Sequence, residues 1–411
     1  MVVPVKPQAE TTTFRSDERK VWYAPNGFEA YGEAEINAVT QCLRDGWLAG
    51  FGKRTVEFEE RVATMFGKKY GLFVNSGSSA CLLALACLNL PTGSKVVTPA
   101  CTFSTTVAPI VQLGMEPVFC DVSAETYLPT VDQIMGVLTA ETRVIMIPNL
   151  IGNLFDWKGL KARLSAADIQ NIVLIEDSAD TIGHVPQGAH ISTTSFYASH
   201  VITACGSGGM VMFDDENQLK RACMLRDWGR IGTNSETMSE RFAHDVDGIP
   251  YDFKFLYGGL GYNLKSSEVN AAFGLVQLDR LSENLAIRKR NFERYLSNLA
   301  DLAKDEVLQV PPAETADIHW LAIPFQCPNG QRLGLLKWLE EANIQTRVTF
   351  SGNITRHPVF RKWLNTYPNS DKIMSDGFLL GCHHGMTVED VDYVCKQIHN
   401  FFGKTAETFG K

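Results

Sequence analysis

The stretch that decides the fold runs from Tyr70 to Val97 and reads YGLFVNSGSSACLLALACLNLPTGSKVV. Its first five residues form a short β-rich run, and an apolar stretch of helical length follows at residues 78–88. A second β-rich run begins at Lys95. The order strand, helix, strand predicts a βαβ unit, in which a crossover helix joins two parallel strands.

The alternation of strands and helices continues far beyond this first unit. We expect further helices at residues 104–113 and 158–167. Further strands are predicted at residues 117–121, 143–148, 172–175, 195–197 and 209–213. Repeated units of this kind predict an α/β fold with a large mixed sheet that is mostly parallel.

Helical patterns flank the alternating region on both sides. Apolar residues recur three and four positions apart in the flanking helices, which are predicted at residues 29–45, 55–66, 279–302, 330–343 and 387–402. The last of them opens with Thr387 and Asp390 in the spacing of a capping box. We divide the chain into a polar tail (1–20), a large domain (21–280), and a linking helix with a smaller α+β domain (281–411).

The composition is that of a globular protein and excludes several functional classes. Of 411 residues, 45% are hydrophobic and 20% are charged, which argues against a disordered or coiled-coil chain. The net charge of −8 gives no electrostatic support for nucleic-acid binding. The longest nearly uninterrupted apolar run, residues 80–90, is shorter than the roughly 18 residues of a membrane helix. The first 20 residues lack the apolar core of a secretory signal, so we expect a cytosolic protein.

The ten cysteines are scattered, with no C-x-C or C-x-x-C pair. Most lie in apolar stretches, where a thiol behaves as a small hydrophobic side chain. We therefore expect reduced, structural cysteines and no metal site.

Two polar turns are candidate anion sites. Residues 75–79 (NSGSS) follow the first strand and begin a helix, where backbone N–H groups, hydroxyls and the helix dipole favour a phosphate. Residues 261–268 (GYNLKSSE) open another helix, and Asn263 and Lys265 offer a donor and a charge. An ordinary turn in which a serine caps the helix is the alternative for both.

Two titratable side chains follow predicted strands. Asp177, in the sequence IEDSAD at residues 175–180, projects toward the edge where open α/β sheets bind ligands. A pyridinium nitrogen would satisfy such a buried carboxylate, while a helix N-cap is the alternative. His200 ends the segment TSFYASH and precedes a Gly-rich turn at residues 206–209. It is a candidate for proton transfer, although an isolated histidine is more often structural.

These four segments, in this order and spacing, resemble the DegT/DnrJ/EryC1 sugar-nucleotide aminotransferase superfamily over residues 21–400. The resemblance implies the aspartate aminotransferase fold (fold type I), the cofactors pyridoxal phosphate (PLP) and pyridoxamine phosphate (PMP), and a homodimer. It implies that Asp177 holds the ring nitrogen and that Asn263 reaches the phosphate of the neighbouring subunit. The other implied cofactor-binding residues are Gly77, Ser78, Phe103, Asp180, Ser195 and Lys265, and the implied substrate-binding residues are Arg230 and Arg347.

One departure from the aminotransferases decides the predicted reaction. His200 stands where they carry the lysine that binds PLP covalently, and an imidazole can move protons but cannot form that bond. Histidine here resembles the sugar-nucleotide 3-dehydratases, of which one kind holds an iron–sulfur cluster on cysteines that include a C-x-C pair. Without that pair the chain is more similar to the kind without a cluster, the GDP-4-keto-6-deoxymannose 3-dehydratases, which use glutamate and carry glutamate at the position of Asp180.

The resemblance implies that His200 is catalytic and that the enzyme removes the C3 hydroxyl of a nucleotide-linked 4-keto-6-deoxyhexose, with glutamate as amino donor. The nucleotide remains open. An aminotransferase in which the lysine has been replaced is the second interpretation, and a noncatalytic PLP-binding regulator is the third.

Overall fold

The computed structural model describes residues 20–25, 29–186, 188–232, 237–315 and 317–403. Of the predicted polar tail, only Lys20 lies within these ranges. No helix in them combines the length and the apolar content required to cross a bilayer.

A seven-stranded sheet forms the centre of the molecule, in the order β1-β7-β6-β5-β4-β2-β3. Strands β2 to β6 pair in parallel, and β7 runs antiparallel to both β1 and β6. The strands are β1 (Tyr70–Val74), β2 (Lys95–Pro99), β3 (Glu116–Cys120), β4 (Thr142–Pro148), β5 (Val173–Ser178), β6 (Ile191–Ser195) and β7 (Gly209–Phe213). The predicted mixed, mostly parallel α/β sheet is confirmed.

Helices cover this sheet, and their apolar faces explain where they lie. The helices are α1 (Glu33–Asp45), α2 (Lys53–Met65), α3 (Gly77–Ala86), α4 (Ser104–Gln112), α5 (Val131–Met135), α6 (Trp157–Ala166), α7 (Glu216–Arg226) and α9 (Glu268–Asp279). On α2, fully buried Phe58 packs edge-to-face against Phe73 of β1, with ring centroids 5.1 Å apart. Burial of one such ring contributes roughly 1.5–3 kcal/mol.

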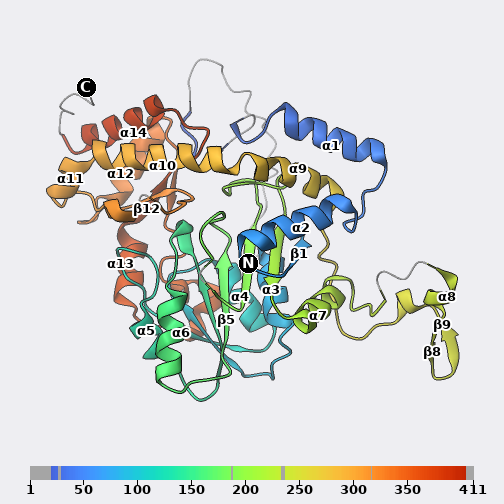
Figure 1. The fold of residues 1–411 in the computed structure, drawn as a ribbon. Coiled ribbons are helices and arrows are strands. Elements are labelled where there is room, and N and C mark those ends of the chain that lie inside the picture. Colours follow the sequence, from blue (N-terminus) through green and yellow to red (C-terminus); the bar gives the residue numbers. More distant parts are fainter. Residues whose placement is uncertain (1–19, 26–28, 187, 233–236, 316, 404–411) are drawn as a thin grey trace.

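A second, three-stranded antiparallel sheet follows in the order β10-β12-β11. Its strands are β10 (Ile323–Gln326), β11 (Thr346–Val348) and β12 (Gly377–Leu380). The long helix α10 and the helix α12 both pack against α14. Helices α10 and α14 run side by side (Figure 1). The helices here are α10 (Leu281–Asn298), α11 (Ala300–Lys304), α12 (Arg332–Glu341), α13 (Pro368–Asp376) and α14 (Val388–Phe401). The predicted capping box of Thr387 and Asp390 is present at the start of α14.

Two predicted elements differ from the structure. The strand expected at residues 195–197 is β6, which ends at Ser195. All five residues of β6, ISTTS, are buried although four of them are polar. Their burial is tolerated because hydroxyl groups bond to the neighbouring strand β5: Thr194 Oγ1, for example, donates to the Ser178 carbonyl at 2.9 Å. The long helix expected at residues 279–302 is divided at Leu299 into α10 and α11.

A small arm beyond α7 was not expected. It consists of α8 (Met238–Arg241), β8 (His244–Val246) and β9 (Ile249–Tyr251), and it projects from the body of the molecule (Figure 1). All residues of its two strands are exposed, including the apolar side chains of Ile249 and Tyr251.

Candidate active site

A cavity of about 550 Å³ lies where the carboxyl ends of β4 and β5 meet the start of α3 and the strand β11 of the second sheet. Most of the predicted site residues line it although they are far apart in the sequence. The predicted site residues that line the cavity are Gly77, Ser78, Phe103, Asp177, Asp180, Ser195, His200 and Arg347. The location agrees with the general rule for open α/β sheets.

The first turn of α3 lines the cavity. Ser76 caps the helix, and its Oγ accepts the Ser79 N–H at 3.1 Å, so the capping role considered from sequence is present. The next two residues, Gly77 and Ser78, still face the cavity, and Ser195 from β6 lies against Gly77. A Cβ added to Gly77 would lie 2.6 Å from the Ser195 Cβ. Two hydroxyls and a helix N-terminus therefore converge at a place suited to a phosphate.

Replacing Gly77 with alanine is expected to raise the PLP dissociation constant about 5- to 150-fold. The new methyl group must displace either the start of α3 or Ser195, and such overpacking costs roughly 1–3 kcal/mol, where 1.4 kcal/mol is tenfold. Absorbance titration of the cofactor-free protein measures this change. Gly32→Ala is the control, because nothing lies within 4 Å of a Cβ there. Unchanged affinity in a folded Gly77→Ala variant would show that this turn does not hold the phosphate.

Asp177 also lines the cavity and is only 6% exposed. One of its carboxylate oxygens accepts the Thr106 hydroxyl at 2.8 Å and the other accepts the Ala179 N–H at 3.2 Å. Burial raises the pKa of this carboxyl, and its partners are all neutral donors. A protonated ring nitrogen would supply the missing positive charge. The alternative role as a helix N-cap is wrong, because no helix separates β5 from β6 in the described chain.

Phe103 adds an aromatic surface to the cavity. Phe103 is 51% exposed, at the residue preceding α4, and its ring contacts Phe350 edge-to-face with centroids 6.0 Å apart. An exposed ring fixed from behind in this way can stack on a planar ligand. The cavity thus fits a group with a phosphate, a flat ring and a ring nitrogen.

His200 lies in the turn after β6, with its backbone N–H donating to the Tyr197 carbonyl at 3.0 Å. Burial lowers the pKa of the imidazole to about 4, and the positive charge of Arg288 acts in the same direction. The neutral ring is therefore available as a base. Among the described residues that line the cavity there is no lysine.

Arg347 on β11 contributes the cationic side of the cavity. Its guanidinium lies over the ring of Tyr23, 5.4 Å from the centroid. Tyr23 was not expected from the sequence. It enters the site because Val21 pairs with Ile344, next to β11, and because the Tyr23 N–H donates to Gln345 Oε1 at 3.1 Å. Neither a motif nor a periodic pattern marks this segment.

Three predicted residues do not line the cavity of their own chain. Asn263, Lys265 and Arg230 gather instead around Asp227 and Trp228. The Lys265 ammonium is 3.2 Å from an Asp227 carboxylate oxygen and 3.8 Å from the centre of the Trp228 ring.

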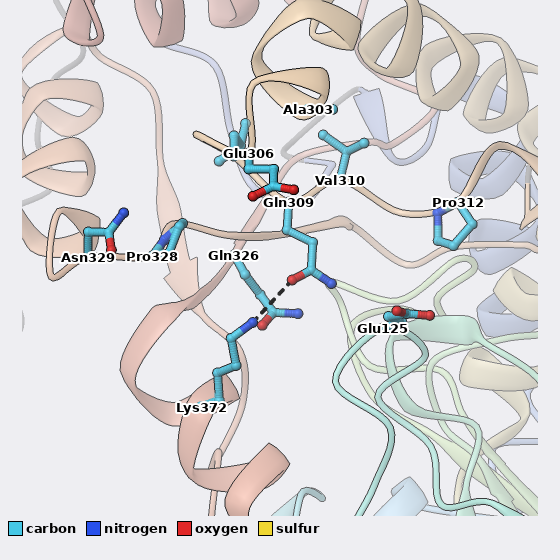
Figure 2. Close-up of a pocket in the computed structure, with 11 residues that line it drawn as sticks. Glu125, Ala303, Glu306, Gln309, Val310, Pro312, Gln326, Pro328, Asn329 and Lys372 are labelled. Atoms are coloured by element: carbon cyan, nitrogen blue, oxygen red, sulfur yellow. Dashed lines mark hydrogen bonds between the residues drawn. The ribbon is translucent and has the colours of Figure 1, made fainter.

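A second cavity, of about 690 Å³, lies between the segment after α11, β10 and α13 (Figure 2). Lys372 donates there to Gln309 Oε1 at 3.4 Å, and Glu125, from the segment between β3 and α5, also lines the cavity. None of the predicted site residues lines this cavity.

The cysteines are free thiols, and only Cys205 is exposed. Burial raises the pKa of most of them, as for Cys101, whose pKa is about 12. Within the described ranges, no cluster of three or more histidine, cysteine, aspartate or glutamate side chains is arranged to hold a metal ion.

Comparison with known proteins identifies the family of the chain. Residues 29–399 match the DegT/DnrJ/EryC1/StrS aminotransferase family. The chain is 36% identical to the lipopolysaccharide biosynthesis protein RfbH of Salmonella typhimurium, over 92% of this chain and 91% of that protein. It is 35% identical to a dTDP-4-dehydro-2,6-dideoxy-D-glucose 3-dehydratase of Saccharopolyspora spinosa, over 97% of this chain and 90% of that protein.

The fold is also that of a solved structure, the E. coli GDP-4-keto-6-deoxy-D-mannose-3-dehydratase with bound hydrated PLP. The TM-score is 0.81 at 24% identity, with 92% of this chain and 100% of that chain covered. The aspartate aminotransferase fold expected from the resemblance is thereby confirmed. The chain belongs to the DegT/DnrJ/EryC1/StrS aminotransferase family, whose members are PLP-dependent enzymes of sugar-nucleotide metabolism.

Proposed function

We propose that this enzyme removes the C3 hydroxyl of a nucleotide-linked 4-keto-6-deoxyhexose and takes the amino group it needs from glutamate. The observation that carries the proposal is His200, a base inside the cavity in place of a covalent lysine. A relative at 35% identity whose name is that of a 3-dehydratase supports it. The nucleotide stays open, because that relative is named for a dTDP-sugar and others for GDP-sugars.

The residues of the cavity have separate tasks in this proposal. The first turn of α3 and Ser195 bind the cofactor phosphate, Phe103 stacks on the ring, and Asp177 keeps the ring nitrogen protonated. When bound, PLP or PMP supplies an electron sink and carries the amino group. Arg347 binds a carboxylate or phosphate of the substrates, since its planar fork bonds such groups with two hydrogen bonds.

His200 moves the protons in both halves of the reaction. It takes the Cα proton of glutamate in the first half and the proton at the cofactor's C4′ atom in the second. Its neutral form at pH 7 follows from burial, which lowers its pKa. The C3 hydroxyl then leaves as water, the two reducing equivalents come from the oxidation of glutamate to 2-oxoglutarate, and ammonia is released from the product.

The subunit arrangement and the domains are part of the same proposal. We assign residues 21–280 to a large cofactor-binding domain and 281–411 to a linking helix and small domain. Two subunits share each active site, with Asn263 and Lys265 donated by the partner. Ten cysteines without a C-x-C pair support a reaction that uses no iron–sulfur cluster.

The direct test is product analysis with glutamate and 4-keto-6-deoxyhexoses linked to GDP, CDP, dTDP or UDP. One of them is expected to lose its C3 oxygen, with one 2-oxoglutarate and one ammonia formed per turnover. An amino sugar that keeps the C3 hydroxyl would instead make the enzyme an aminotransferase. Cofactor binding with no turnover of glutamate would favour the noncatalytic regulator.

PLP is expected to bind without a covalent link to the chain, because no lysine lines the cavity in the described residues. Borohydride reduction of the PLP-loaded enzyme, followed by mass spectrometry, should leave the polypeptide mass unchanged. His200→Lys is the positive control for the chemistry of reduction. A pyridoxyl adduct on a wild-type lysine at the cavity would refute the expectation.

A further inference from the structure

The backbone at Ile151 is in a conformation that a β-branched residue rarely adopts. Its φ is +62° and its ψ is 3°, in the left-handed region, and its side chain is fully buried. Such strain persists only where surrounding contacts enforce it, and it is concentrated at functional sites. Ile151 follows β4, close to the cavity, where its neighbour Leu150 is one of the lining residues.

Two hydrogen bonds hold Ile151 in place. Its carbonyl accepts the Leu321 N–H at 2.8 Å, and its own N–H donates to Asp180 Oδ2 at 2.8 Å. The segment at Leu321 is in turn fixed by the buried guanidinium of Arg288 on α10, whose Nη1 donates to the Leu321 carbonyl at 3.0 Å. The unusual backbone thus aims one N–H at one oxygen of Asp180.

The second oxygen of Asp180 faces the proposed base. Asp180 Oδ1 lies 3.9 Å from His200 Nε2, and the two side chains are 11% and 15% exposed. This distance is longer than a hydrogen bond but within the range of an ion pair. His200 Nδ1 is buried and has no hydrogen-bond partner. The backbone of Ser195 favours the protonated ring, and Asp180 is the carboxyl group that faces its Nε2 atom.

Burial makes a charge on Asp180 or on His200 unfavourable unless the other residue carries the opposite charge. Burial raises the pKa of Asp180 to about 7, and the negative charge of Asp177 acts in the same direction. Burial and Arg288 lower the pKa of His200. The other titratable groups that face the pair are Tyr23 and Arg347 across the cavity, and Tyr197 beside the imidazole. A proton taken up by His200 therefore needs the negative charge of Asp180 nearby.

We propose that Asp180 is a positioning residue that orients His200 and provides the counter-charge when the imidazole carries a proton, and that the backbone of Ile151 fixes Asp180 for this task. The role rests on the proposed function, in which His200 moves the protons. It goes beyond cofactor binding, the role that the family resemblance implies for Asp180.

The test is an NMR titration of the cofactor-free enzyme with isotope-labelled histidine. The His200 signals are identified by their loss in His200→Asn. In Asp180→Asn the change of the His200 signals near pH 7, where Asp180 ionises, is expected to disappear, because the carboxyl 3.9 Å from the imidazole is removed. Unchanged His200 titration in the folded variant would overturn the proposal.

Glu176→Gln is the matched control, on the strand β5 that precedes Asp180. Glu176 is also a buried carboxylate, but it accepts the Ser192 hydroxyl at 2.6 Å and does not line the cavity. This variant should leave the titration of His200 unchanged. If Asp180→Asn does not fold, Asp180→Ser carries the same expectation, because its hydroxyl can still accept the Ile151 N–H.

Turnover provides a second measurement. Asp180→Asn should lower kcat at least tenfold and change its pH profile, with the KM for glutamate within about threefold. Asp180→Glu restores the carboxylate and should recover much of kcat.

If wild-type enzyme shows no dehydratase activity but the His200 titration depends on Asp180, the proposed function fails while the pairing of Asp180 with His200 stands. If dehydratase activity is present but the titration shows no such dependence, the proposed function stands while the pairing fails.

Discussion

Replacement of His200 with asparagine is expected to lower sugar dehydration by at least 10²- to 10⁴-fold, the usual contribution of a single general acid–base group. The amide keeps a similar size and one N–H donor, but it cannot gain and lose a proton near neutral pH. Because His200 is the proton carrier in both proposed half-reactions, each half should be impaired. Single-turnover absorbance measurements with glutamate, and product analysis with the sugar nucleotide, follow the two halves separately.

Cofactor affinity distinguishes a chemical defect from a damaged site. PMP should bind to His200→Asn within a few-fold of wild type, because the phosphate turn, Asp177 and Phe103 remain in place. His399→Asn is a matched control: this buried histidine pairs with Asp301 outside the cavity. Turnover by His200→Asn equal to that of the control would assign the base to another residue.

The reverse exchange, His200→Lys, brings back the side chain that forms the covalent link in the aminotransferases. We expect a borohydride-stable PLP adduct and some aminated sugar. The yield should be small, because His200 lies in a turn whose space is shaped for an imidazole near Asp180.

The sequence predicts the sheet well where strands are apolar and poorly where they are not. β1, β2 and β4 are buried runs of Val, Ile, Leu and Phe, and their approximate positions follow from that composition. β6 carries Ser and Thr at the centre of the sheet, and its hydroxyls are satisfied by β5, a partner that no local pattern reveals. The arm with β8 and β9 lacks a buried face, so hydrophobic periodicity gives no signal for it.

The residues of the candidate site can likewise be predicted only where a local sequence pattern marks them. Residues that stand within a recognisable turn, such as Gly77 and His200, could be singled out because polar and glycine residues follow a strand. Tyr23 and Ile151 could not be singled out from the sequence in this way. Tyr23 reaches the cavity through pairing with the distant segment at Gln345, and the conformation of Ile151 depends on Leu321. Contacts between distant parts of the chain decide both.

Mixing two inactive variants is expected to restore activity, because the proposed active site is built from two subunits. Asn263 and Lys265 do not line the cavity of their own chain, although the backbone of Leu264 accepts the N–H of Asn75, next to the phosphate turn. One variant carries His200→Asn and the other carries Asn263→Ala together with Lys265→Ala. A charge-assisted hydrogen bond from Lys265 to a buried phosphate is worth roughly 1.5–3 kcal/mol, or one to two decades of cofactor affinity.

In a heterodimer of these variants, one active site carries both defects and the other carries none. With random exchange at equal amounts, half of the dimers are heterodimers, so activity should return to roughly a quarter of the wild-type value. PLP should also stabilise the dimer, since a ligand held by both subunits favours the state that binds it. If Asn263 and Lys265 act only within their own chain, every site in the mixture keeps one defect. Activity then stays absent after subunit exchange has been verified, and the shared site is excluded.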